Sequence, residues 1–218
     1  MEKKILHVKA KVLSPFHYNH LPIAGGSSTL PHVITDTSIM FALANALGNI
    51  NQGLLLKGNP NYKQDIKNLP IKSSLFKRNP VDGIPELMEP LAQRFSITDE
   101  YYSFTDFKRN NKLSASGMFK EFFFIQQIPY GAEYTGTLYG VDPFELLGCS
   151  EIIVRIGINR SGIIMLKKTE SNDIRLNAYT ANMMTGNQFK VENIWLGRIY
   201  ETYSINEHDF IQEVSLWN

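Results

Sequence analysis

The sequence predicts an α+β fold, in which an antiparallel, ferredoxin-like sheet carries helices on one face and a β-hairpin protrudes from the body. Three observations predict it: an alternating segment at the N-terminus, an almost wholly apolar helix after it, and a series of β-type segments that follows. The 218 residues, 43% of them hydrophobic, suffice for one domain with a large core. We therefore expect a single domain over residues 1–218, with an inserted hairpin at about 96–128.

The first strand is predicted at Lys4–Leu13, where apolar and polar side chains alternate with period two. A polar loop rich in proline and glycine, Ser14–Val33, follows and carries three of the five histidines. Loops of this length inside a domain are often functional. The helix after it is expected to be capped by Thr35 or Asp36 and to end at Gly48.

The middle of the chain predicts a weak helix and a long hairpin. The signal is poor over Asn49–Pro90, and Ile84–Phe95 is expected to form a short helix broken near Pro90. Two strands, Ser96–Phe104 and Lys120–Ile128, flank a polar and basic connection, so that we expect a projecting hairpin or, equally, an ordinary solvated loop. Another strand is predicted at Gly131–Val141.

The clearest local signal is the hairpin of Glu151–Ile158 and Gly162–Lys168, two β-branched segments around a short polar turn. Gly157, inside the first of these strands, predicts the close approach of a ligand or of another backbone. Beyond it, Leu176–Met184 is ambiguous. Gln188–Tyr203 is expected to contain a strand pair or a bulged strand, and Glu207–Asn218 a last strand or a docked segment.

Charge and composition exclude several classes of protein. The net charge of +1 argues against a free nucleic-acid binder, but not against a subunit that concentrates a few basic residues on one surface. Cys149, the single cysteine, has no partner in the chain for a disulfide, which favours a reducing compartment. No signal-peptide core and no membrane-spanning run is found, so a cytoplasmic protein without membrane contact is expected.

The motifs of the common enzyme classes are missing: no phosphate-binding glycine loop, dinucleotide fingerprint, nucleophile elbow or cysteine zinc site is present. We therefore expect no catalytic residue, no metal and no cofactor. His17 and His20 would need a third ligand, such as His32 or Asp36, to hold a metal, and surface or capping roles are favoured. Two alternatives remain: a metal-independent endoribonuclease that uses one of these histidines with Lys112 or Lys167, and a module that binds protein only.

Three features favour RNA binding. Basic residues gather on the last clear hairpin, aromatic and basic residues adjoin in the projecting hairpin, and a glycine pair lies in the histidine loop. Basic side chains contact phosphates, and aromatic rings stack on unpaired bases. The candidate RNA-binding residues are Arg155, Arg160, Ser161, Lys167, Lys168, Lys108, Arg109, Lys112, His17, Tyr18, His20, Gly25 and Gly26.

Short blocks over about a third of the chain resemble a known family. The first block is Val154–Gly162 (VRIGINRSG), which is followed by Leu166–Lys168 and Leu176-Asn177. The others are an opening strand that ends in Leu13–Pro15 and the apolar helix Ile34–Gly48 that ends in Ala-Leu-Gly. These blocks resemble RAMP (repeat-associated mysterious protein) subunits of CRISPR Cascade-type surveillance complexes, most closely the subtype I-D-like branch of the Cas-five family.

The resemblance implies an RRM-like body with a thumb hairpin at Ser103–Phe119. Such a subunit caps the backbone filament, binds the 5′ handle of the guide RNA, contacts the backbone and large subunits and meets target DNA indirectly. It usually has no catalytic role, although a related subunit of one subtype cleaves precursor RNA. The handle pocket would lie between Phe16–His32 and Arg155–Lys168. The glycine-rich loop that family members often carry near the C-terminus is missing here, which weakens the inferred handle contacts.

Overall fold

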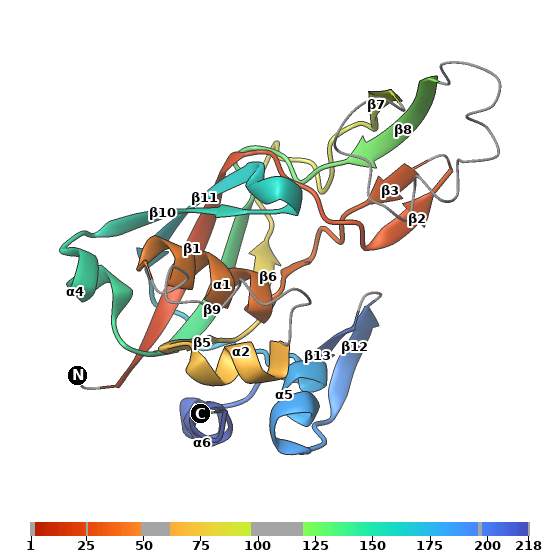
Figure 1. Cartoon of the computed structure of the whole chain (residues 1–218). Coiled ribbons are helices and arrows are strands. Elements are labelled where there is room, and N and C mark those ends of the chain that lie inside the picture. The colour runs from red at the N-terminus through yellow and green to blue at the C-terminus, as the bar shows by residue number, and fades with distance from the viewer. Residues whose placement is uncertain (1–2, 25, 49–61, 97–119, 196–197, 218) are drawn as a thin grey trace.

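The computed structural model describes residues 3–24, 26–48, 62–96, 120–195 and 198–217. Its centre is a seven-stranded sheet in the order β10-β11-β1-β9-β6-β4, with β5 also paired to β9 (Figure 1). Every pair in this sheet is antiparallel. The strands are β1 (Lys4–Ser14), β4 (Val33–Ile34), β5 (Ile71–Ser73), β6 (Phe76–Asn79), β9 (Glu133–Gly140), β10 (Glu151–Ile156) and β11 (Gly162–Lys168).

The connectivity confirms the predicted α+β, ferredoxin-like fold. Four positions of the sheet lie side by side in the order β11, β1, β9 and β5/β6. Along the sequence, the chain runs from β1 through a helix to β5/β6, returns in β9, and reaches β11 after a second helix. This is the βαββαβ succession of a ferredoxin-like sheet. The helices are α1 (Asp36–Ala46) and α4 (Pro143–Leu147), and β10 is an added edge strand.

The face of the sheet that α1 covers is called the inner face. Val8, Ala10 and Val12 of β1 are fully buried there, in one core with Ile39 and Leu43 of α1. The alternation predicted for β1 is thereby confirmed. The helix begins where predicted, because the side chain of Thr35 accepts a hydrogen bond from the amide of Ser38.

Helix α6 (Glu207–Ser215) covers one end of the opposite face, where Nε2 of His7 lies 2.9 Å from the carboxylate of Glu207. A second core joins α1, α2 (Tyr62–Asn68), α5 (Ala178–Thr185) and α6 with this end of the sheet. Trp217, fully buried, anchors the C-terminal segment in it. The tail is therefore docked, as one alternative expected, but it is a helix and not a strand. The segment Leu176–Met184, for which the sequence pattern is ambiguous, is mostly helix α5.

A four-stranded sheet extends from one end of the main sheet (Figure 1). It consists of β2 (Leu21–Ile23), β3 (Gly26–Ser28), β8 (Lys120–Gln126) and β7 (Leu91–Ser96), in that order. The helix predicted over Ile84–Phe95 is wrong, because pairing with β8 draws residues 91–96 into a strand. The Ser14–Val33 loop likewise contains two strands. Strands β7 and β8 pair at the position where the predicted hairpin would begin, and residues 97–119, which include nearly all of its predicted first strand, lie outside the described part.

The strand pair predicted near the C-terminus is β12 (Val191–Trp195) and β13 (Ile199–Thr202). Glu201 of β13 is buried, and its carboxylate lies 3.1 Å from Nζ of Lys77 on β6. This ion pair ties the hairpin to the main sheet. None of the described helices is long and apolar enough to cross a membrane.

Candidate nucleic-acid interface

The part of the main sheet opposite α1 that α6 leaves uncovered is called the outer face. The strand register places its side chains in rows across β9, β1, β11 and β10. One row runs Thr135, Lys9, Lys167 and Glu151, and the next runs Glu133, Lys11, Met165 and Ile153. Arg155 lies opposite Ile163 in a third row. The face is thus a mixture of basic, acidic and aliphatic side chains.

Two of the four cations that β1, β10 and β11 carry on this face are neutralised by neighbours. Lys9 lies 3.1 Å from the carboxylate of Glu133, and Lys167 lies 3.2 Å from that of Glu151. Lys11 and Arg155 form no ion pair with any residue in the described ranges. Standard strand spacings place their Cα atoms about 12 Å apart. These two cations are the ones available to an anionic ligand.

The basic residues predicted to form one cluster are divided between the two faces. Arg155 and Lys167 lie on the outer face, whereas Lys168 reaches Asp142 Oδ2 at 2.7 Å and Arg160 donates to Asn45 Oδ1 of α1 at 3.3 Å. Successive side chains of a strand point to opposite faces, which separates neighbours in sequence. The prediction of a single cationic cluster is therefore wrong. Whether each residue binds RNA stays a prediction.

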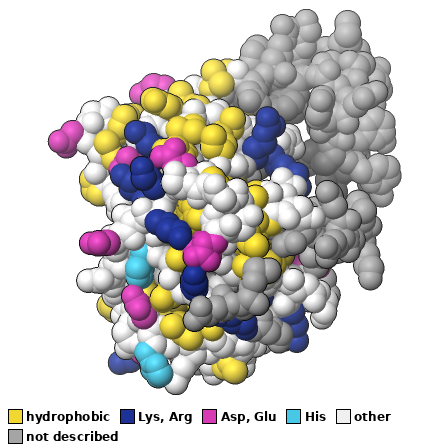
Figure 2. All heavy atoms as spheres, turned by 90° about the vertical axis from the view of Figure 1, so that its left-hand side faces the viewer, with side chains coloured by type: hydrophobic (Ala, Val, Ile, Leu, Met, Phe, Trp, Pro, Cys, Tyr) yellow, Lys and Arg dark blue, Asp and Glu magenta, His cyan; other side chains and the backbone are white. Residues whose placement is uncertain are grey.

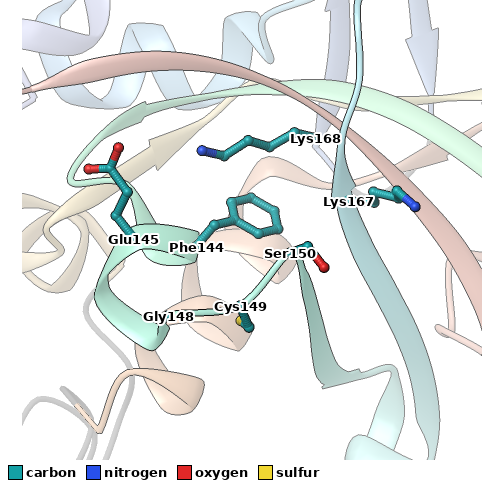
Figure 3. Close-up of a pocket in the computed structure, with 7 residues that line it drawn as sticks. All are labelled: Phe144, Glu145, Gly148, Cys149, Ser150, Lys167 and Lys168. Atoms are coloured by element: carbon teal, nitrogen blue, oxygen red, sulfur yellow. The ribbon is translucent and has the colours of Figure 1, made fainter.

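The two adjacent lysines line a cavity of about 440 Å³ beside α4 (Figure 3). The Lys168 side chain extends over the ring of Phe144, with Nζ 5.4 Å from the ring centroid, while Lys167 points away from that ring. Because both ammonium groups face carboxylates, this cavity offers little free positive charge. Its lining residues are Phe144, Glu145, Gly148, Cys149, Ser150, Lys167 and Lys168.

The histidine loop lies against the turn between β10 and β11. The amide of Ile158 donates to the carbonyl of His17 at 3.0 Å, and the amide of Gly157 donates to the hydroxyl of Tyr18 at 3.1 Å. The glycine at position 157 therefore lets the backbone of the histidine loop approach closely, which is one of the two roles that the sequence predicts for it. Ser161 is exposed in the same turn. The loop and the turn are thus in direct contact at these positions, and a handle pocket between Phe16–His32 and Arg155–Lys168 stays a prediction.

Two of the three histidines of this loop, His17 and His20, are partly buried. His20 stacks on Tyr18 with 5.1 Å between ring centroids, and its Nδ1 lies 3.3 Å from the amide of Leu30. Burial lowers the pKa of His20 to about 4 and also lowers the pKa of His17. His32 stacks instead on Trp195. No three His, Cys, Asp or Glu side chains within the described ranges gather as a metal site would require.

The remaining predicted RNA-binding residues are Gly26, which the structure describes, and four residues that lie outside the described ranges. Gly26 pairs in parallel with Phe124 of β8, and a Cβ at position 26 would overlap the backbone of Phe124. The absence of a side chain thus admits a neighbouring strand, and the expectation that it admits a phosphate is wrong at this position. The remaining predicted residues, Gly25, Lys108, Arg109 and Lys112, lie outside the described part of the chain.

Sequence reasoning missed Lys11 as a ligand candidate. The alternation of β1 indicates that Lys9 and Lys11 share the polar side of the strand, but exposure to solvent is enough to explain two lysines there. The register places Glu133 directly opposite Lys11, yet its carboxylate pairs with Lys9, so only the side-chain geometry of the folded protein shows which lysine is neutralised. No local signal carries that information.

No protein-family model and no curated protein matches the sequence. Several solved structures are similar to this chain. A chain in the cryo-EM structure of the type III-B Cmr-beta bound to cognate target RNA and AMPPnP matches with 12% identity and a TM-score of 0.47, covering 94% of this chain and 88% of that one.

Two further structures match this chain with lower TM-scores. A chain of a type IV-B CRISPR complex has 10% identity and a TM-score of 0.37, with 77% of this chain and 91% of that one covered. Oligomeric Cmr4 from Pyrococcus furiosus has 13% identity and a TM-score of 0.35, with 78% and 100% covered. Likenesses of this size say nothing by themselves about what the present chain binds.

Proposed function

We propose that this chain is a non-catalytic RNA-binding subunit of a CRISPR RNA-guided surveillance complex. The observation that carries the proposal is the pair of cations, Lys11 and Arg155, on the outer face of a ferredoxin-like sheet, neither of which forms an ion pair within the described part of the chain. Sequence blocks that resemble RAMP subunits supply the identity of the complex. On this proposal the outer face holds the sugar-phosphate chain of the guide RNA.

The composition of the outer face favours phosphate contacts over base stacking. In the rows across β9, β1, β11 and β10, no described side chain beyond the end covered by α6 carries an aromatic ring. Phosphate contacts fix the register of a nucleic acid without reading its bases. Ile153 and Met165, between the two cations, would contact sugars or base edges.

The finer role that we propose is binding of the 5′ handle and capping of the backbone filament. The resemblance of the opening strand, helix and β10–β11 hairpin to the Cas-five family supports this role. The β7–β8 hairpin, which stands off the main sheet, would be the base of the thumb (Figure 1). Contacts with the backbone and large subunits, and indirectly with target DNA, belong to the same proposal.

The endoribonuclease alternative finds little support in the geometry of the histidine loop. Phe16 contacts Gly162 at the start of β11 and His17 contacts the neighbouring Gly157, whereas Lys167 lies five residues along that strand, roughly 17 Å away at the usual rise. Lys112, the other candidate partner, lies outside the described residues. A general base and its cationic partner must both reach one phosphate. His20, with a pKa of about 4, is also a weak base.

Binding of labelled single-stranded RNA, followed by fluorescence anisotropy over a series of salt concentrations, tests the proposal. Lys11→Gln/Arg155→Gln is expected to weaken binding about tenfold or more and to reduce the salt slope by about 1.4, the value for two phosphate contacts on a single strand. The control, Lys63→Gln/Lys190→Gln, removes two exposed positive charges elsewhere and should bind like the wild type.

Two outcomes contradict the proposal. If the control variant loses as much affinity as the test variant, binding reflects net charge and not the outer face. If the wild type does not bind RNA even at low salt, alone or in its purified complex, the chain is a protein-only module. Incubation with repeat RNA in chelator should leave the RNA intact, and a cleavage product abolished by His17→Ala or His20→Ala would show an enzyme.

A further inference from the structure

Strand β10 forms an unprotected edge of the main sheet. Among the described residues it pairs with β11 alone, in a continuous register without a bulge. The strand contains no proline. An edge of this kind presents a row of backbone N–H and C=O groups to any strand that approaches, and proteins usually block such edges with proline, lysine or a bulge.

The side chains of β10 alternate strictly between the two faces. Ile152, Val154 and Ile156 are each 3% exposed and belong to the inner core. Glu151, Ile153 and Arg155 are exposed on the outer face, and Ile153 is 62% exposed. Figure 2 looks onto the side of the molecule that carries β10 and α4, and shows hydrophobic, basic and acidic side chains intermingled there.

The outer-face triplet is complementary to itself in an antiparallel arrangement. If a second β10 is paired about a two-fold axis at Ile153, Glu151 of each copy lies opposite Arg155 of the other. The two Ile153 side chains meet on the axis. Directly opposite side chains on adjacent antiparallel strands are near neighbours, and both opposite charges and aliphatic pairs are favourable there.

We propose that the occupant of this edge is a second copy of the same chain, joined through β10 to β10 in a two-fold symmetric dimer. The rows of the outer face then continue from one copy to the other. In one row, Lys167 and Glu151 of one copy are followed by Arg155 of the second copy, so the charges alternate in sign. In the next row, Met165 and Ile153 of one copy meet Ile153 and Met165 of the other. The same patch on both subunits is what an isologous interface requires.

The dimer leaves the outer face open, because it uses the edge of the sheet and not its surface. It also adds nothing unfavourable to the inner face, where the β10 side chains are already buried against α1 and α4. Arg155 takes part in both proposals: its guanidinium faces Glu151 of the other copy in the dimer and a phosphate in the RNA-binding role. The dimer itself does not depend on RNA. Its test uses the full chain without RNA.

The first test measures molar mass over a concentration series by analytical ultracentrifugation. Glu151→Arg and Arg155→Glu each place two like-charge pairs where two opposite-charge pairs stood, and each is expected to raise the dimer dissociation constant about tenfold or more. The double variant Glu151→Arg/Arg155→Glu restores both pairs in reverse order, and so should dimerise like the wild type.

A mixture of the two single variants gives an independent prediction. One carries arginine at both positions and the other glutamate at both, so the mixed dimer has two opposite-charge pairs. An equimolar mixture should therefore dimerise more strongly than either variant alone. Glu151→Arg also separates the two proposals, because it should break the dimer while RNA binding, which gains a positive charge, persists.

Cross-linking tests the register. Ile153→Cys in a Cys149→Ser background should form an intermolecular disulfide on oxidation, because residue 153 faces itself across the axis. Leu147→Cys, an exposed position on α4, is the control and should remain monomeric on a denaturing gel. A wild type that stays monomeric up to high micromolar concentration, or a dimer that survives both charge reversals without the 153 disulfide, overturns the proposal.

Discussion

The side chain of Phe16 occupies the space that a Cβ would take at Gly162, so that the chain leaving β1 crosses directly over the start of β11. Gly157, at the other side of the same turn, has φ of +81° and would place its Cβ 3.0 Å from the Cβ of Phe16. Two glycines thus admit one aromatic side chain. The packing of Phe16, which is 1% exposed, depends on both.

Gly162→Ala should destabilise the protein by about 2–4 kcal/mol, because neither Phe16 nor the strand can move without disturbing the core. Urea denaturation measures this as a lower midpoint. Gly148→Ala is the matched control: Gly148 has φ of +63° but no atom within 4 Å of its Cβ position, so its cost is about 1 kcal/mol. Equal losses in the two variants would show that the contact with Phe16 is not the cause.

Lys168 is expected to support the fold and not RNA binding. Burial by itself would raise the pKa of Asp142, but hydrogen bonds from Lys168 and from the amides of Glu145 and Phe144 lower it. Lys168→Met should therefore cost about 1–2 kcal/mol at pH 7. Since a lowered carboxyl pKa contributes stability that is lost as pH falls through the folded-state value, the difference from wild type should vanish in acid.

The matched variant for this pair is Lys167→Met. Its partner Glu151 and Lys167 itself are both exposed, and such pairs contribute little to stability. Unfolding midpoints at pH 7 compare the two variants, and RNA binding is measured in parallel. An RNA affinity that falls with Lys168→Met while the midpoint stays unchanged would contradict the structural role assigned to Lys168.

His20 should make the protein less stable in weak acid. Its folded-state pKa of about 4 lies below its ordinary value of 6.5, so the unfolded chain binds the proton more tightly. The stability present above pH 6.5 is lost as the pH falls through 4, and amounts to on the order of 1–3 kcal/mol. His20→Phe keeps a ring on Tyr18 but cannot titrate.

A pH series of unfolding midpoints compares His20→Phe with the wild type. The variant should show a shallower decline between pH 6.5 and 4, although it starts lower because the amide of Leu30 loses its acceptor. Parallel curves for the two proteins would mean that His20 titrates normally in the folded state.

Asn177 is expected to be the most sensitive polar residue of the C-terminal part. Its side chain accepts hydrogen bonds from the amides of Tyr179 and Tyr200 and lies 3.3 Å from Asp36 Oδ1. Asn177→Ala removes the cap of α5 and leaves buried groups unpaired, at a cost of about 2–4 kcal/mol. Thermal unfolding measures it, with the exposed Asn182→Ala as control.

The pH dependence of this loss follows from Asp36. Burial raises the pKa of its carboxyl, against hydrogen bonds from Thr180 and Asn177 that lower it. Asn177→Ala should raise that pKa further, so the penalty of a buried charge grows as the pH rises through the folded-state value. The deficit of the variant should therefore be smaller in acid than at pH 7. A deficit independent of pH would show that Asp36 does not sense Asn177.

Local patterns in the sequence predicted much of the fold correctly. The alternation of β1, the cap at Thr35 and the β10–β11 hairpin all depend on neighbours within a few positions, and each is confirmed. The errors fall where a distant partner decides. Residues 91–96 are a strand because β8 pairs with them, and Gly26 joins a sheet through Phe124, about a hundred residues away.

The sequence by itself determined which segments are strands and helices wherever period and capping residues agree, and it pointed to the β10–β11 hairpin as basic. Only the tertiary structure decided which of those basic residues share a face and which are neutralised. Side chains alternate along a strand, so Lys167 and Lys168 diverge, and their acidic neighbours Glu151 and Asp142 arrive from other elements. Lys11 and Arg155 are brought onto one surface by pairing between strands that lie far apart in the chain, and no local pattern encodes that pairing.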